Sequence, residues 1–211
     1  MILLLATAHA GSCDLPIFSK IAAPTPDAKG QGVATGEGTL DGKAAIGGRF
    51  VRQSAVGLDA WKKVLTTPDN QDEWVPDRFG YERSERIDAS HLYLLFDIGL
   101  VWGQVHIKRQ LVVEYHEEPT ATGIRTCWKM VDPTPWMGRI SAWVQPDVDW
   151  ENASTGWWEA TPTPTGTTVG YQWWTVVGQI PGAVQQFGMR NTIPDLLAAF
   201  DARAAAIQAG K

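Results

Sequence analysis

The chain has 211 residues and a formal net charge of −5, which fits one domain with a sizeable core and argues against a nucleic-acid partner. No apolar run approaches the ~20 residues that a membrane-spanning helix needs. Eleven residues are tryptophans. Each indole buries a large flat surface, so this excess indicates either a dense core or the wall of a ligand cavity.

The N-terminus has the features of an export signal. Residues 1–5 are apolar, small residues follow, and Ala8-His9-Ala10 matches the pattern that precedes a signal-peptidase cleavage site. We therefore expect residues 1–10 to be a signal peptide and the protein to be exported, either to the periplasm or outside the cell.

A linker and a single domain are expected after the signal. Residues 11–31 carry three prolines and are interpreted as the linker, and residues 32–211 as the domain. Cys13 and Cys127 are the two cysteines, and they show no metal-site spacing. Three fates stay open for Cys13: a lipid anchor, as in a lipoprotein, removal by cleavage, or a disulfide with Cys127 in the exported protein.

The first elements are a hairpin and a short helix. Residues 32–51 form two strand-like runs around Asp41-Gly42, a strong two-residue hairpin turn. Residues 54–67 have helical spacing, and Pro68 ends the pattern. The apolar face of this helix consists of Leu58, Trp61, Val64 and Leu65.

Alternating strands follow over residues 79–88, 91–103 and 105–115. The second of them places Leu92, Leu94, Phe96 and Ile98 on one face. The third places Val105, Ile107, Leu111, Val113 and Tyr115 together. Arg109 belongs to this apolar set, so strict alternation directs a cation toward the core. A buried cation needs a partner, which is either a carboxylate or a polar ligand group inside a cavity.

Residues 123–132 alternate again, 139–145 suggest one short strand, and 156–177 read as a hairpin that turns at 164–166. This hairpin carries two tryptophan pairs. Alternation sends one tryptophan of each pair outward, and Trp158 and Trp174 on one surface would form a patch for a membrane or a protein partner.

The C-terminal segment predicts the helix around which the chain is organised. Asn191 or Thr192 can cap its start, and Pro194 falls in the first turn, where proline is tolerated. Helical spacing relates Leu196, Leu197, Phe200, Ala204 and Ile207. One amphipathic helix after many strands predicts an α+β fold: a curved antiparallel sheet wrapped around a long C-terminal helix, with a short helix near the start.

This order resembles the helix-grip fold of START lipid-transfer domains and of the wider SRPBCC superfamily, which includes polyketide cyclases. The likeness covers roughly residues 32–209 and is carried by 54–77, 92–115 and 170–200, the last with a Gly-x-Ile-Pro turn before the closing helix. The resemblance implies an apolar tunnel between the sheet and the long helix, which holds a lipid, a sterol or a polyketide.

The leading functional hypothesis is non-catalytic binding or transfer of a lipid or other hydrophobic small molecule. The residues expected to line the cavity are Phe96, Ile107, Arg109, Trp128, Tyr171, Trp173, Leu197 and Phe200. No catalytic motif, metal site or cofactor is predicted, and we expect a monomer that contacts membranes transiently. The alternative is a polyketide cyclase or aromatase-like enzyme in which Arg109 and Tyr171 polarise a carbonyl.

Overall fold

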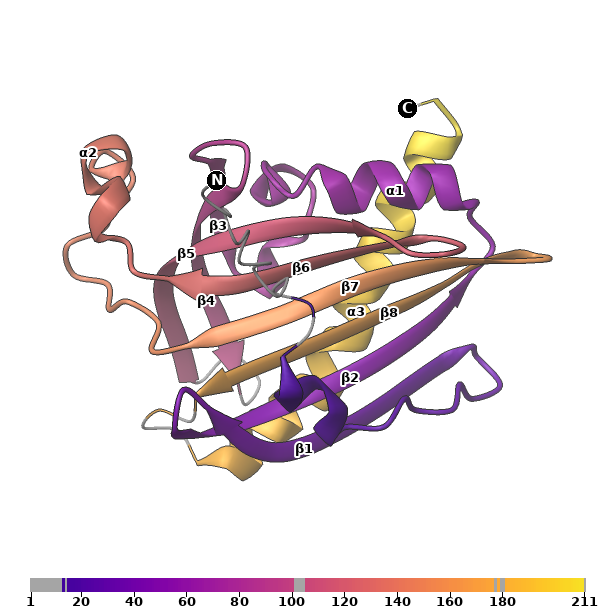
Figure 1. Ribbon diagram of the computed structural model, residues 1–211, viewed down its shortest axis with the longest axis horizontal. Helices are drawn as coiled ribbons and strands as arrows, with labels where there is room; N and C mark the ends of the chain where they lie inside the picture. Colours follow the sequence, from indigo (N-terminus) through magenta and orange to yellow (C-terminus); the bar gives the residue numbers. More distant parts are fainter. Residues whose placement is uncertain (1–12, 14, 101–104, 177, 179–180, 211) are drawn as a thin grey trace, which may run out of the picture.

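The structure is a computed structural model that describes residues 13, 15–100, 105–176, 178 and 181–210, without the side chains of 78, 98–100 and 105–107 (Figure 1). Its elements are β1 (Gln31–Leu40), β2 (Lys43–Ser54), α1 (Leu58–Thr66), β3 (Tyr81–Arg86), β4 (His91–Leu100), β5 (Val105–Pro119), β6 (Ile124–Val131), α2 (Met137–Ile140), β7 (Ser154–Thr163), β8 (Gly166–Val176) and α3 (Gly182–Gln208).

One curved antiparallel sheet holds the eight strands in the order β1-β2-β8-β7-β6-β5-β4-β3. Pairing of β2 with β8 joins the first hairpin to the last one, and α3 crosses one face of the sheet (Figure 1). Asp41 and Gly42 have φ angles of 51° and 74°, as a tight hairpin turn between β1 and β2 requires. The predicted fold class, a sheet gripping a long C-terminal helix, is confirmed.

Large rings lie directly over two glycines of the sheet. A Cβ on Gly47 of β2 would come within 2.4 Å of the Trp174 indole on β8. A Cβ on Gly156 of β7 would come within 2.7 Å of the Trp128 indole on β6. Because glycine has no side chain, Gly47 leaves room for the Trp174 ring on one face of the sheet, and Gly156 leaves room for the Trp128 ring on the other.

The long helix α3 starts earlier than the sequence predicted. It begins at Gly182, and Pro194 lies inside it instead of in its first turn. A proline removes one backbone donor from a helix interior, so Pro194 donates no bond to the carbonyl of Arg190. Asn191, expected as a cap, instead donates from its side-chain amide to the Phe187 carbonyl at 2.7 Å. The predicted apolar face itself is buried, at Leu196, Leu197, Phe200 and Ala204.

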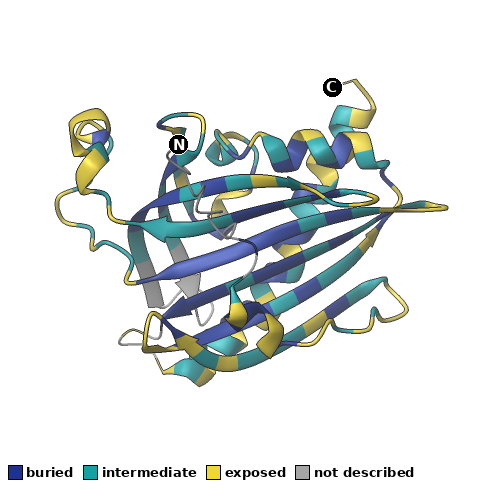
Figure 2. Cartoon of the chain, viewed as in Figure 1, coloured by how far each residue is buried: buried dark blue, intermediate teal, exposed yellow. Residues whose placement is uncertain are grey.

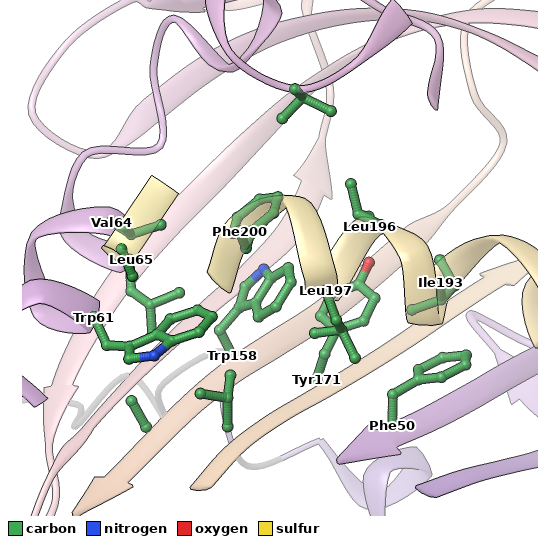
Figure 3. Packing of buried hydrophobic residues seen from close by; sticks show 14 of the residues in the cluster. Phe50, Trp61, Val64, Leu65, Trp158, Tyr171, Ile193, Leu196, Leu197 and Phe200 are labelled. Carbon is green, nitrogen blue, oxygen red and sulfur yellow. The ribbon is translucent and has the colours of Figure 1, made fainter. Parts of the chain in front are cut away.

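The main core lies between the concave face of the sheet, α1 and α3, as Figure 3 shows. Trp158 is 8% exposed and belongs to this core, so the prediction that it faces outward is wrong. Trp174 does point to the opposite, convex face, but it is completely buried there. The predicted exposed tryptophan patch therefore does not exist.

The N-terminal segment covers part of the convex face, on the side of the sheet opposite α3 (Figure 1). Ile17, Phe18 and Ile21 are buried against strands of this face, and a disulfide joins Cys13 to Cys127 of β6. Within the segment predicted as a linker, residues 11–31, the described residues from 15 to 21 thus pack against the sheet.

The connection between β6 and β7 covers another part of the convex face, around Tyr93, Leu95 and Val112. The short strand predicted over 139–145 is wrong, because this stretch contains the end of α2 followed by turns. Gln110, 1% exposed, holds the connection by donating to the carbonyls of Gln145 at 3.0 Å and Val148 at 2.6 Å. Figure 2 shows the result, a sheet buried along its centre and exposed at the hairpin tips.

Candidate ligand cavity

A cavity of about 140 Å³ lies between the concave face of the sheet and α3. Its wall comes from α1, the loop that follows it, the strands β3 to β8 and α3. The apolar part of the wall includes Leu94, Phe96, Leu111, Val113, Ile193 and Leu196. Among the described lining residues there is no Asp, Glu, Lys, Arg or His.

Five of the predicted lining residues lie on this wall. They are Phe96, Trp128, Tyr171, Trp173 and Phe200. Leu197 is 3% exposed and packs in the core without lining the cavity. The side chain of Ile107 lies outside the described residues. Contact of these residues with a ligand stays a prediction.

Arg109 lies on the same cross-strand row as Phe96, but its guanidinium is held elsewhere. Its Nη1 donates to the carbonyl of Lys108 at 2.7 Å and lies 3.7 Å from Oδ2 of Asp149. β6 pairs with β5 only as far as Val112, and beyond it the segment 149–151 pairs with Gln110, the residue after Arg109. The sequence left two partners open for Arg109, a carboxylate or a ligand group, and the structure shows the carboxylate of Asp149. Arg109 is not among the described residues that line the cavity.

At one end of the cavity, aromatic rings from the sheet and from α3 pack against one another (Figure 3). The indole of Trp158 lies between two rings: Tyr171 on β8, at 4.2 Å between centroids, and Phe200 on α3, at 4.6 Å. The ring of Trp74, from the loop after α1, meets Phe200 edge-on at 4.8 Å. One end of the cavity is therefore formed by packed aromatic rings.

Several polar groups of the wall are satisfied by the protein. The Tyr115 hydroxyl donates to the Leu65 carbonyl and so ties β5 to α1. Ser154 accepts from Nε1 of Trp173 at 2.6 Å and donates to the Trp174 carbonyl at 3.2 Å. These bonds hold the wall in place and offer little to a ligand.

The tyrosines of the wall stay protonated at any physiological pH. Burial raises the pKa of Tyr81 to about 12. Burial, with a further contribution from Tyr81, raises the pKa of Tyr171 well above its usual value. Burial likewise raises the pKa of Tyr115. The cavity thus presents neutral hydroxyls and apolar surface.

Sequence reasoning selected aromatic residues of the wall, Tyr171 among them, and missed its serine and threonine hydroxyls, above all Thr126. The signal was present, because the alternation that places Trp128 on the concave face of β6 places Thr126 there too. A threonine in an alternating strand is usually taken for a solvent-facing residue, whereas Thr126 is 1% exposed and lines the cavity.

The described residues hold one group with metal-ligand chemistry, Cys13, Glu118 and Cys127 on the convex side. The two sulfurs are joined in the disulfide, so neither is a thiolate that could bind a metal. Within the described part of the chain, no helix is both long and apolar enough to cross a membrane.

No protein-family model matches the sequence, and no curated protein matches it. Solved structures do match. A STAR-related lipid transfer protein from Xanthomonas axonopodis has a TM-score of 0.63 and 20% identity, over 88% of this chain and 99% of its own. Human StAR-related lipid transfer protein 5 has a TM-score of 0.60 and 14% identity, over 92% and 89%. At these identities the likeness concerns the fold, and the chain therefore has the helix-grip fold of the START/SRPBCC proteins.

Proposed function

We propose that this protein binds a hydrophobic small molecule, such as a lipid, between the concave sheet and α3, and carries it without changing it. The observation that carries the proposal is the cavity itself, an apolar space with no charged residue among its described lining. Two proteins with the same fold, the Xanthomonas protein and the human protein described above, are named as lipid transfer proteins, and this supports the proposal.

The size of the cavity limits what it holds in this conformation. At about 140 Å³ it is smaller than the roughly 300–1,000 Å³ that is typical of sites for drug-sized ligands. An apolar void of about 150 Å³ can take up a single benzene ring. The ligand is therefore either ring-sized or enters with one end, and a longer molecule requires α3 to move outward. Each methylene group of the ligand that is buried in the cavity contributes about 0.8 kcal/mol to the free energy of binding.

We also propose that the protein works outside the cytoplasm. The disulfide between Cys13 and Cys127 supports export, because disulfides persist in oxidising compartments. A Cys13 sulfur in a disulfide cannot carry a lipid, so this proposal favours the disulfide over the anchor. Monomeric state and transient membrane contact remain predictions from the sequence.

The enzyme alternative requires Arg109 and Tyr171 to meet the same carbonyl. Tyr171 lines the cavity, whereas Arg109 is held by the Lys108 carbonyl and Asp149. No observation on the described residues favours the cyclase-like reaction over carriage, so we do not propose it.

A cavity-blocking variant tests the proposal. Leu94→Trp places a large ring in the cavity wall, and Val33→Trp places the same ring at an exposed site on β1, outside that wall. Native mass spectrometry and displacement of a hydrophobic fluorescent probe are expected to detect an apolar ligand in the wild type and in Val33→Trp. Leu94→Trp, folded by circular dichroism, is expected to lose it. No bound ligand and no probe binding in the wild type would contradict the proposal.

A further inference from the structure

Three side chains with metal-ligand chemistry meet on the convex side of the sheet. Cys13 of the N-terminal segment, Cys127 of β6 and Glu118 of β5 bring two sulfurs and a carboxylate oxygen within 4.8 Å of one another. Tetrahedral zinc binds sulfur at about 2.3 Å and carboxylate oxygen at about 2.0–2.2 Å, so its ligand atoms lie roughly 3.6–3.8 Å apart. The spread of the three atoms therefore fits one zinc ion, once the bond between the sulfurs is broken.

The register of the strands explains why these residues meet. Glu118 of β5 is opposite Arg125 of β6, and His116 is opposite Cys127. Alternate residues of a strand share a face, so Glu118 is a diagonal neighbour of Cys127 on the convex side, within reach of a long side chain. Cys13 reaches the same place from 114 positions earlier in the chain. The fold thus assembles a ligand set that shows no motif spacing in the sequence.

The carboxylate of Glu118 is not engaged by another residue. Arg125, the cation opposite it, donates from Nε to the Glu159 carboxylate at 2.8 Å instead. Among the described residues, the structure gives Glu118 no hydrogen bond and no ion pair. Glu118 is half-buried, so an ion can reach its carboxylate from solvent. A carboxylate beside two sulfurs, without a cation of its own, is available as a third ligand.

The redox state of the two cysteines decides whether the set can bind a metal. Only thiolates bind metal ions, and in the structure the two sulfurs form a disulfide. A phosphine reduces a disulfide to two thiols and becomes the phosphine oxide, with water supplying the oxygen and both protons. A divalent cation then replaces the two thiol protons, which pass to solvent.

We propose that reduced Cys13 and Cys127, together with Glu118, bind one zinc ion, with water as the fourth ligand, and that this site replaces the disulfide as the link between the N-terminal segment and β6. Metal binding and disulfide formation exclude each other, because both use the same two sulfurs. The proposal does not depend on carriage of a ligand, since the set lies on the opposite face of the sheet from the cavity.

Cobalt(II), a spectroscopic substitute for zinc, tests the proposal on the full chain reduced with a phosphine. We expect one Co²⁺ per chain, a sulfur-to-cobalt charge-transfer band, the visible bands of tetrahedral cobalt, and loss of both on addition of Zn²⁺. The oxidised protein is expected to show neither band. Zn²⁺ should also raise the melting temperature of the reduced protein, because it binds the folded state. Absence of the charge-transfer band from the reduced protein would overturn the proposal.

Variants assign the ligands. Cys13→Ser is expected to abolish the charge-transfer band of a single two-thiolate site. Glu118→Gln is expected to weaken Zn²⁺ binding by at least about tenfold, since even residues that only support metal ligands have effects of that size. Glu117→Gln is the matched control, because Glu117 is exposed and alternation turns it to the other face of β5. Its affinity should equal that of the wild type.

The outcomes decide between a built site and surface binding. Equal affinity in Glu118→Gln and Glu117→Gln, or an unchanged band in Cys13→Ser, overturns the proposal and leaves the carrier proposal standing. Circular dichroism establishes that each reduced variant is folded. Where Cys13→Ser fails to fold, the cobalt stoichiometry of the wild type and the comparison of the two glutamate variants still decide.

Discussion

The indole of Trp158 stacks on the ring of Phe200, with centroids 4.6 Å apart and planes 16° from parallel. Trp158 comes from the middle of β7 and Phe200 from the second half of α3. Their contact joins the helix to the concave face of the sheet and also forms the aromatic end of the cavity. Stability and ligand binding thus depend on the same pair of rings.

The first prediction concerns this contact. Phe200 is 2% exposed, and Phe200→Ala is expected to lower the free energy of unfolding by about 3–5 kcal/mol, as for other buried aromatic truncations. Phe187→Ala is the control on the same helix, at a side chain that is 51% exposed. Urea denaturation followed by circular dichroism measures both. Equal losses in the two variants would contradict the assigned contact.

A buried hydroxyl fixes α3 to β2 and α1. Ser54 donates to the Asp201 carboxylate on α3 and accepts from Nε1 of Trp61 at 3.1 Å. Ser54→Ala leaves the fully buried indole N–H of Trp61 without its acceptor, so we expect a loss of about 1–3 kcal/mol in unfolding free energy. Ser19→Ala, at an exposed hydroxyl, is expected to change it by less than about 0.5 kcal/mol. The reverse order would contradict the network.

The disulfide is expected to contribute strongly to stability. It joins residues 114 positions apart, and closing a loop of this length typically stabilises a domain by about 2–5 kcal/mol. Reduction should lower the melting temperature of the wild type but not of a variant with both cysteines replaced by serine. Mass spectrometry of the intact exported protein should show the oxidised pair. A diacylglycerol adduct on Cys13 would contradict it.

Two glutamates are expected to change stability with pH in opposite directions. Burial raises the pKa of Glu151 above its usual 4.5, against the lowering effects of the Asn152 amide and Arg109. The folded state therefore holds this proton more tightly, and stability falls as pH rises from the usual pKa through the raised one. Glu151→Gln should be more stable than the wild type at pH 7, with the gain disappearing below the usual pKa.

Glu114 provides the opposite sign. Burial would raise its pKa, but Lys129, 3.0 Å away, and His116 outweigh burial and lower it. Its contribution is present above the usual pKa and is lost as pH falls through the lowered one. Glu114→Gln should thus be less stable than the wild type at pH 7 and equal to it in strong acid. Unfolding free energies from pH 2 to pH 8 that move the same way in both variants would contradict these signs.

Local patterns predicted most of the fold because they report directly on local structure. The Asp41-Gly42 turn and the apolar face of α1 appear as predicted. Because proline is more common in the first turn of a helix than in its interior, Pro194 led to a predicted start of α3 that lies too late in the chain. In the folded protein the packing of α3 on the sheet outweighs that local preference.

The coverage of the convex face could not be predicted locally. Trp174 does point outward as alternation requires, but a segment more than 150 positions earlier in the chain buries it. The segment after β6 has no period that reveals its packing. Trp128 was predicted in the cavity wall because a large aromatic side chain on an apolar face indicates burial. Thr126 was missed because a threonine in a strand does not by itself indicate that it lines a buried cavity.

The position of a bound ligand tests the central claim most directly. Nuclear Overhauser effects can be recorded between a bound apolar probe and the methyl groups of selectively labelled protein. Leu111 on β5 and Leu196 on α3 line the cavity from opposite sides. We predict that the probe contacts both leucines at once, because it lies between sheet and helix. A bound probe that contacts neither of them would contradict the account.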